Sequence, residues 1–87
     1  PLSTSCEENC QPEYPSVLDG AEGSAGIRLI ISEDGKVIDA KVAVSNGNPT
    51  LDREALEAAE RMEFSSIERD RAIVQINITF TVTGSDN

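Results

Sequence analysis

The most regular hydrophobic pattern lies near the end of the chain. In the stretch "IVQINITFTV", residues 73–82, apolar and polar side chains alternate. Successive side chains of a strand point to opposite faces of a sheet, so this period of two predicts a strand over residues 72–82 with one buried and one solvated face. The predicted core positions are Val74, Ile76, Ile78, Phe80 and Val82, and the solvated ones are Gln75, Asn77, Thr79 and Thr81.

Two earlier apolar runs predict a β-hairpin. "GIRLIIS" begins at Gly26, "VIDAKVAV" begins at Val37, and the turn residues "EDGK" separate them. Asp34-Gly35 suits the centre of a type I′ turn, in which both central residues have positive φ. This turn would place Glu33 opposite Lys36 and predicts the pairs Ile31/Ile38, Leu29/Ala40 and Ile27/Val42 on an apolar face, with Ile30/Asp39 and Arg28/Lys41 on the other. A bulge that turns Val37 inward is the alternative register.

The segment after the polar loop at residues 45–50 predicts a helix. Asn48 or Thr50 can cap it, and Pro49 is tolerated at the first helical position. The apolar positions that follow share one side of a helix, which predicts packing of that side on the sheet. They are Leu51, Ala55, Ala58, Ala59 and Met62.

These elements together predict the order β-β-α-β and an α+β fold, in which a three-stranded antiparallel sheet carries one helix packed on one face. The stretch "FSSIERDR", residues 64–71, predicts a turn or irregular crossing before the last strand. We expect a flexible N-terminal arm over residues 1–24, one ordered domain over residues 25–83 and a disordered tail over residues 84–87.

The charge balance narrows the classes of function. The chain has 16 acidic and 7 basic residues and a formal net charge of -9, which repels nucleic-acid phosphates and anionic membrane surfaces. Its apolar runs are far shorter than the roughly 20 residues that a membrane span needs. Because the chain begins at Pro1 and not at Met, we expect it to be a piece of a longer protein, with any anchor outside it.

The reactive side chains do not indicate an enzyme. Without histidine, neither a Ser/His/Asp nor a Cys/His constellation can form. Cys6 and Cys10 are the only cysteines, and two thiols supply a zinc site poorly. They could close a short disulfide loop in an oxidising compartment or remain free thiols. We expect no metal and no cofactor.

The last predicted strand is a candidate binding element. Between Ala72 and Val82 it has no Pro, Gly or charged residue. Such residues usually prevent an edge strand from pairing with another chain. At the edge of the sheet it could pair with an extended peptide, or with a second copy of the chain to form a strand-exchanged homodimer. A central position, or cover by the N-terminal arm, is the alternative.

Several short motifs follow one another between residues 11 and 82. They are the Tyr-Pro of "QPEYP", the turn Gly35-Lys36-Val37, the loop Ser45-Asn46-Gly47 followed by Leu51-Asp52 and Ala55, and Phe64 after the helix. In this order and spacing they make the chain resemble the C-terminal domain of the TonB family of periplasmic energy transducers.

The resemblance implies a periplasmic domain at the C-terminal end of a protein anchored in the inner membrane. Its third strand would bind the TonB box, an extended segment of outer-membrane TonB-dependent transporters, by strand addition. Inner-membrane, proton-driven motor proteins would pull on this pairing for the uptake of iron siderophores or similar nutrients. A TonB-like structural or self-assembling module of another cell-envelope protein is the alternative.

The resemblance also implies where the peptide would bind. In the family, the Gln-Pro-x-Tyr-Pro segment lies near the bound peptide, and Tyr14 would offer it a rigid apolar face and a hydroxyl group. Packing of Tyr14 over the edge of a small core is the alternative. The predicted partner-binding residues are Gln11, Pro12, Tyr14, Pro15, Val74, Gln75, Ile76, Asn77, Ile78 and Thr79.

Overall fold

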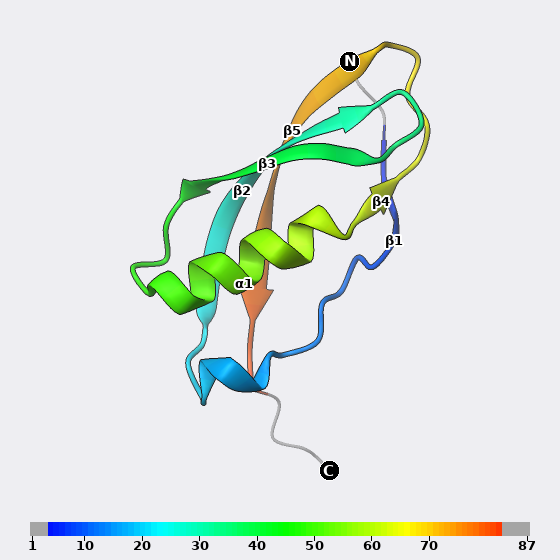
Figure 1. The fold of residues 1–87 in the computed structure, drawn as a ribbon. Helices are drawn as coiled ribbons and strands as arrows, with labels where there is room; N and C mark the ends of the chain where they lie inside the picture. Colours follow the sequence, from blue (N-terminus) through cyan, green and yellow to red (C-terminus); the bar gives the residue numbers. More distant parts are fainter. Residues whose placement is uncertain (1–3, 83–87) are drawn as a thin grey trace.

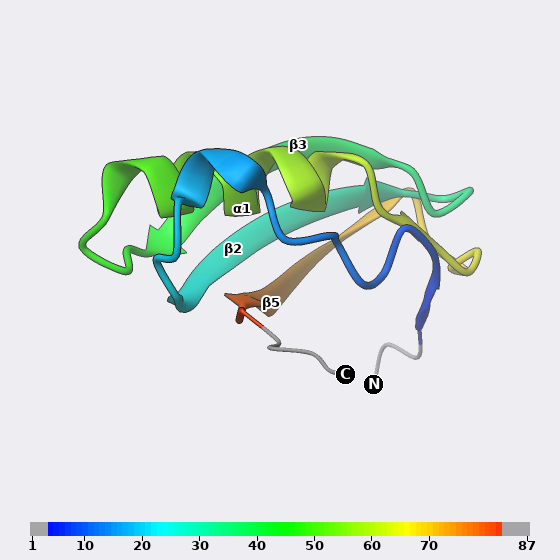
Figure 2. The same ribbon diagram turned by 90° about the horizontal axis from the view of Figure 1, so that it is seen from below.

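The computed structural model describes residues 4–82, in which one helix lies across one face of an antiparallel sheet (Figures 1 and 2). The predicted α+β fold class is confirmed, with two short strands added to it. The predicted tail at residues 84–87 lies outside the described residues. In chain order the elements are β1 (Cys6–Glu8), the 3-10 helix η1 (Ser16–Leu18), β2 (Gly23–Ser32), β3 (Val37–Val44), α1 (Pro49–Glu60), β4 (Glu63–Phe64) and β5 (Arg71–Phe80).

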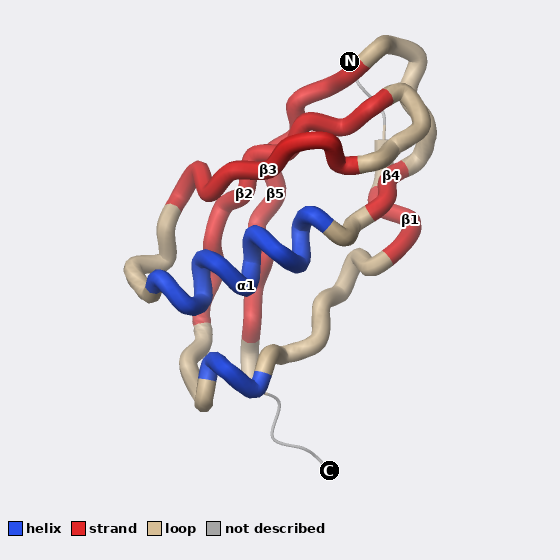
Figure 3. Tube along the Cα trace, in the orientation of Figure 1, coloured by secondary structure: helices blue, strands red, loops and turns tan. Residues whose placement is uncertain are grey.

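The main sheet has the strand order β3-β2-β5, and β1 pairs separately with β4 (Figure 3). β2 and β5 are antiparallel and pair without interruption from Gly23 with Phe80 to Ser32 with Arg71. Within residues 4–82, no strand pairs with the other side of β5. The last strand therefore lies at the edge of the sheet, which the sequence pattern left open.

The hairpin formed by β2 and β3 has most of the predicted register. Four predicted pairs are present: Ile27/Val42, Arg28/Lys41, Leu29/Ala40 and Ile30/Asp39. The fifth prediction was wrong, because a register shift after Ile30 pairs Ile31 with Val37 instead of Ile38. This shift brings Val37 to the half-buried side, where it packs against the core, and leaves Ile38 53% exposed.

The prediction of a type I′ turn centred on Asp34-Gly35 was also wrong. Gly35 alone of the turn residues has positive φ, at 86°, and Ser32 instead of Glu33 faces Lys36. The Ser32 N–H donates to the Lys36 carbonyl at 2.8 Å, and the Gly35 N–H donates to the Ser32 carbonyl at 2.9 Å. The loop thus has three residues and ends in a glycine, a form that also suits a twisted hairpin.

Side chains stabilise the two ends of this turn. The Ser32 hydroxyl donates to the Asp34 carboxylate and lowers its pKa. The Lys36 ammonium donates to Glu63 Oε1 at 3.1 Å, and this bond raises the pKa of Lys36. The Lys36 pair links the hairpin to β4, which follows the helix.

Asn48 caps α1, and the predicted apolar stripe is buried. Asn48 Oδ1 accepts hydrogen bonds from the N–H groups of Thr50 and Leu51, at 3.0 and 3.3 Å, which satisfies donors that a helix start leaves free. All five stripe residues are at most 5% exposed. α1 has 12 residues, and no helix in the described part of the chain is long and apolar enough to span a membrane.

The inner face of β5 matches the predicted alternation with one exception. Ile78 and Phe80 are buried, and Val74 and Ile76 pack partly buried against the core. Val82 was predicted to be a core residue but is 50% exposed, because β5 ends at Phe80 and Val82 lies beyond the sheet.

The segment before the hairpin has more regular structure than the sequence predicts. β2 begins at Gly23, two residues before the predicted start of the domain, and β1 and η1 lie within the predicted arm. Strand formation by Gly23-Ser24 runs against the low strand propensity of glycine, but the pairing with β5 supplies the partners. β1 and β4 have three and two residues, too few for a periodic pattern.

Substitution of Gly35 should test the contact between the turn and β4. A Cβ atom at residue 35 would lie 1.9 Å from the Phe64 carbonyl oxygen, and φ is positive there. We expect Gly35→Ala to lower the free energy of unfolding by about 3 kcal/mol or more. Urea unfolding measures this change.

Gly20→Ala is the matched control. Gly20 has a similar φ of 91°, but an added Cβ meets no described atom within 4 Å. In this variant the free energy of unfolding should fall by only about 1 kcal/mol, the cost of placing alanine at a positive φ. Equal losses in the two variants would contradict the close approach of β4 to the turn.

Candidate functional site

A groove of about 420 Å³ follows the open edge of β5. Six of the predicted partner-binding residues meet in it: Gln11, Pro12, Ile76, Asn77, Ile78 and Thr79. The remaining lining residues are Cys6 and Cys10 from the N-terminal segment, and Met62 and Phe64 from the end of the helix and β4. No lining residue is charged, although the chain has 16 acidic and 7 basic residues.

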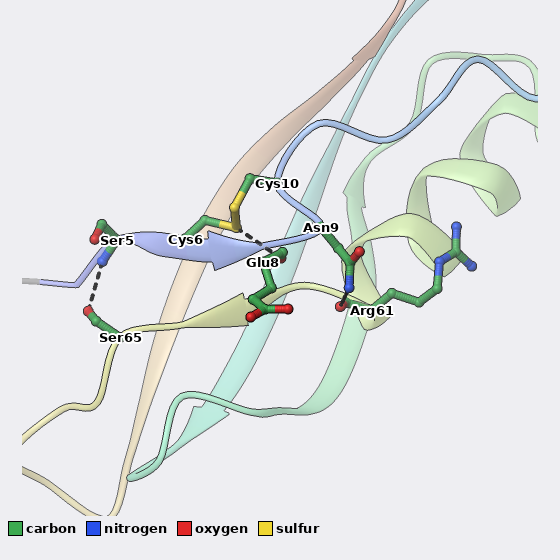
Figure 4. Close-up of a disulfide and its surroundings, with 7 residues drawn as sticks. All are labelled: Ser5, Cys6, Glu8, Asn9, Cys10, Arg61 and Ser65. Atoms are coloured by element: carbon green, nitrogen blue, oxygen red, sulfur yellow. Dashed lines mark hydrogen bonds between the residues drawn. A yellow bond between two sulfur atoms is a disulfide. The ribbon is translucent and has the colours of Figure 1, made fainter.

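The N-terminal segment passes the sheet on the β5 side, opposite β3 (Figure 1). One attachment is the pairing of β1 with β4, in which Cys6 lies opposite Phe64. Ser65 extends this pairing, because its N–H donates to the Ser5 carbonyl at 2.8 Å and its Oγ accepts from the Ser5 N–H at 3.1 Å (Figure 4).

The Cys6–Cys10 disulfide closes a loop in this segment, with 5.8 Å between the two Cα atoms (Figure 4). Within the loop, Asn9 has a φ of 59°, a conformation that asparagine tolerates. Its Nδ2 donates to the Arg61 carbonyl at 2.9 Å, at the end of α1 where helix carbonyls lack partners. The disulfide loop is thereby attached to the helix as well as to β4.

Tyr14 and Pro15 do not line the β5 groove. The Tyr14 ring meets the Phe80 ring edge-on, with centroids 6.5 Å apart, and its hydroxyl donates to the Ala21 carbonyl at 2.8 Å. Both residues line a second, more polar hollow against α1, which includes Glu54 and Ala58. The observed contacts of Tyr14 are those of a residue that packs over the edge of the core.

Val74 and Gln75 belong to the same edge strand but do not line the groove. Sequence reasoning missed Met62 and Phe64 as groove residues and predicted them only as part of the core stripe and a family motif. It also missed Asn9, whose contact with Arg61 spans 52 positions in the chain. Such long-range contacts leave no local pattern.

The site offers hydrogen-bonding backbone and an apolar surface. Because β5 pairs on one side, alternate residues direct N–H and C=O groups away from β2, toward the groove side of the strand. Among residues 4–82, no three Cys, Asp or Glu side chains gather where they could hold a metal ion. The arrangement is suited to pairing with another extended backbone.

Comparison with known proteins decides the family. The family model described as "Gram-negative bacterial TonB protein C-terminal" matches residues 10–83 of the chain. This chain belongs to the TonB C-terminal domain family. TonB C-terminal domains are periplasmic parts of energy transducers, are not enzymes, and interact with TonB-dependent transporters.

Solved structures show the same fold. The chain is similar to the solution NMR structure of the Pseudomonas aeruginosa TonB C-terminal domain, with a TM-score of 0.69 and 20% sequence identity. The alignment covers 95% of this chain and 90% of that chain. The search among curated proteins found no match. The family match begins at residue 10, so β1 and Cys6 lie outside the part that the TonB family model describes.

The Tyr14 contacts lead to a stability prediction. Tyr14→Phe keeps the ring on Phe80 but leaves the part-buried Ala21 carbonyl without its donor, so we expect a loss of about 1 kcal/mol in the free energy of unfolding. Tyr14→Leu should lose about 0.5–1.5 kcal/mol more, because it also removes the aromatic pair. Urea unfolding of both variants measures these losses, and an unchanged Tyr14→Phe would contradict the hydrogen bond.

Proposed function

We propose that this domain binds the TonB box of outer-membrane TonB-dependent transporters by adding it as a strand to β5. The observation that supports this most directly is the open edge of β5 beside an uncharged groove. Membership of the TonB C-terminal domain family supplies the class of partner. We further propose that the bound strand runs parallel to β5.

The proposed role is mechanical. Main-chain hydrogen bonds hold the added strand largely irrespective of its side chains, which would let one transducer serve several transporters. Force applied to the domain would reach the peptide through β5. Because β5 is joined to β2 along its whole length, from Arg71 to Phe80, a shorter added strand would detach before the sheet opens.

We infer that the source of this force lies outside the chain. In the proposed arrangement the domain is the C-terminal part of a protein anchored in the inner membrane, and proton-driven motor proteins act on its other parts. The substrate would be a siderophore or a similar nutrient that the partner transporter recognises. The family match supports the periplasmic placement of the domain.

Amide NMR titration with a synthetic TonB-box peptide tests the binding mode. The peptide should have the sequence of a transporter from the same bacterium, and two variants should carry N-methyl groups on its odd or its even residues. N-methylation removes donors that a strand needs while leaving the side chains in place. We expect shifts in residues 71–80 and 10–12, and a loss of about tenfold or more in affinity for one variant only.

Equal binding of the parent peptide and both N-methylated peptides would contradict strand addition. An absence of shifts at millimolar peptide, with the domain folded and monomeric, would contradict peptide binding altogether. The N-methylated peptides leave the protein unchanged, so neither result can arise from misfolding of a protein variant.

A self-assembling envelope module is the second candidate, because the same edge can pair with a copy of itself. β5 has no Pro, Gly or charge after Arg71, and Ile73 on its outer face is 67% exposed. Light scattering over a range of concentrations separates the two. We expect a monomer at micromolar concentration, whereas a stable dimer that excludes the peptide would support the second candidate.

A further inference from the structure

We propose that the Cys6–Cys10 disulfide determines specificity in the peptide site. Together with Pro12 it forms one wall of a pocket that takes an uncharged, apolar side chain of the strand added to β5. This inference rests on the proposed function and names the side-chain chemistry that the site selects.

The geometry of the edge places a partner side chain in this pocket. Side chains of an added strand alternate between the two faces of the sheet, as do those of β5 itself. On the helix-covered face of β5 lie Ile76 and Ile78, and both line the groove. Every second side chain of the added strand would therefore point toward the N-terminal segment.

The side of the pocket formed by Cys6 and Phe64, and its base at Met62, are apolar. Cys6 faces Phe64 across the β1–β4 pair, so their side chains lie on the same side of that pair. Met62 and Phe64 are 5% and 7% exposed and close the groove from the core. On the wall formed by the N-terminal segment, the disulfide and Pro12 bring no hydrogen-bond donor from their side chains, and Gln11 is the polar residue.

This lining discriminates by charge. A carboxylate pushed into the groove would lose hydration without meeting a cation, since no lining residue is charged. The formal net charge of -9 adds a repulsion against acidic side chains. The opposite face of β5 is solvent-exposed at Gln75, Asn77 and Thr79, of which Asn77 and Thr79 also line the groove, so side chains on that face of the added strand meet solvent and uncharged polar groups.

The disulfide keeps the wall in position. It binds Cys10, and with it Gln11 and Pro12, to a strand that is itself paired with β4. Without the covalent link, the attachments between Cys6 and Gln11 reduce to the Asn9 contact with the helix end and the main-chain pairing of β1. Removal of the disulfide should therefore open the pocket on the side of the N-terminal segment.

Met62 provides a direct probe, because it is the only methionine of the chain and it lines the groove. Protein with a ¹³C-labelled methionine methyl group is titrated with TonB-box peptides that carry Phe at each position in turn. We expect a ring-current shift of the Met62 methyl resonance when Phe occupies alternate positions, and no such shift for the positions between them. This test uses the unaltered protein.

A second test measures the disulfide itself. The same peptide with Asp at an inward position should bind the native domain about tenfold or more weakly than the parent peptide. In the double variant Cys6→Ser/Cys10→Ser, we expect this ratio to fall to about twofold, because the opened pocket leaves the carboxylate hydrated. Gly20→Ala is the control, since its site lies outside the groove lining and it should keep the native ratio.

The outcomes separate the two proposals. If the amide resonances of β5 shift but the Met62 methyl resonance does not shift with Phe at any peptide position, the pocket proposal is wrong and strand addition still holds. If the ratio of the affinities for the parent peptide and the Asp peptide is the same with and without the disulfide, the proposed role of the disulfide is wrong. No β5 shifts with any peptide would overturn strand addition and the pocket with it. If the double variant fails to fold, Pro12→Ser tests the same wall.

Discussion

The pairing of β2 with β5 determines both what is buried and what is left open. β2 has partners on both sides and places Ile27, Leu29 and Ile31 in the core with no exposed surface. β5 shares its inner face with this core but has its other edge free within the described residues. The free edge is therefore backed by the core, which would suit the transmission of a pulling force in the proposed function.

In the proposed binding mode, the N-terminal segment adds selectivity to this edge. Two short strands, one disulfide and the Asn9 contact with Arg61 hold it beside β5 without filling the space between them. A backbone edge alone would accept almost any extended chain. In the proposed binding mode, the wall across the groove gives the side chains of the added strand a surface to fit, so main-chain and side-chain recognition would come from different parts of the fold.

The sequence predicted those parts of the fold that have a local period. Alternation predicted β5, and the apolar stripe from Leu51 to Met62 predicted α1. The turn type at Gly35 was missed because the register shift between Ile30 and Ile31, which lets Val37 pack against the core, closes the loop at Ser32 instead of Glu33. β1, β4 and the groove were missed because they exist only through contacts between distant segments.

The central claim is that β5 accepts another strand along its free edge. Amide hydrogen exchange over residues 71–80, measured with and without saturating TonB-box peptide, tests this most directly. We expect alternate amides, whose N–H groups face away from β2, to exchange rapidly in the free domain and to become protected in the complex. Unchanged exchange at these amides, while the resonances of the peptide show that it is bound, would contradict strand addition.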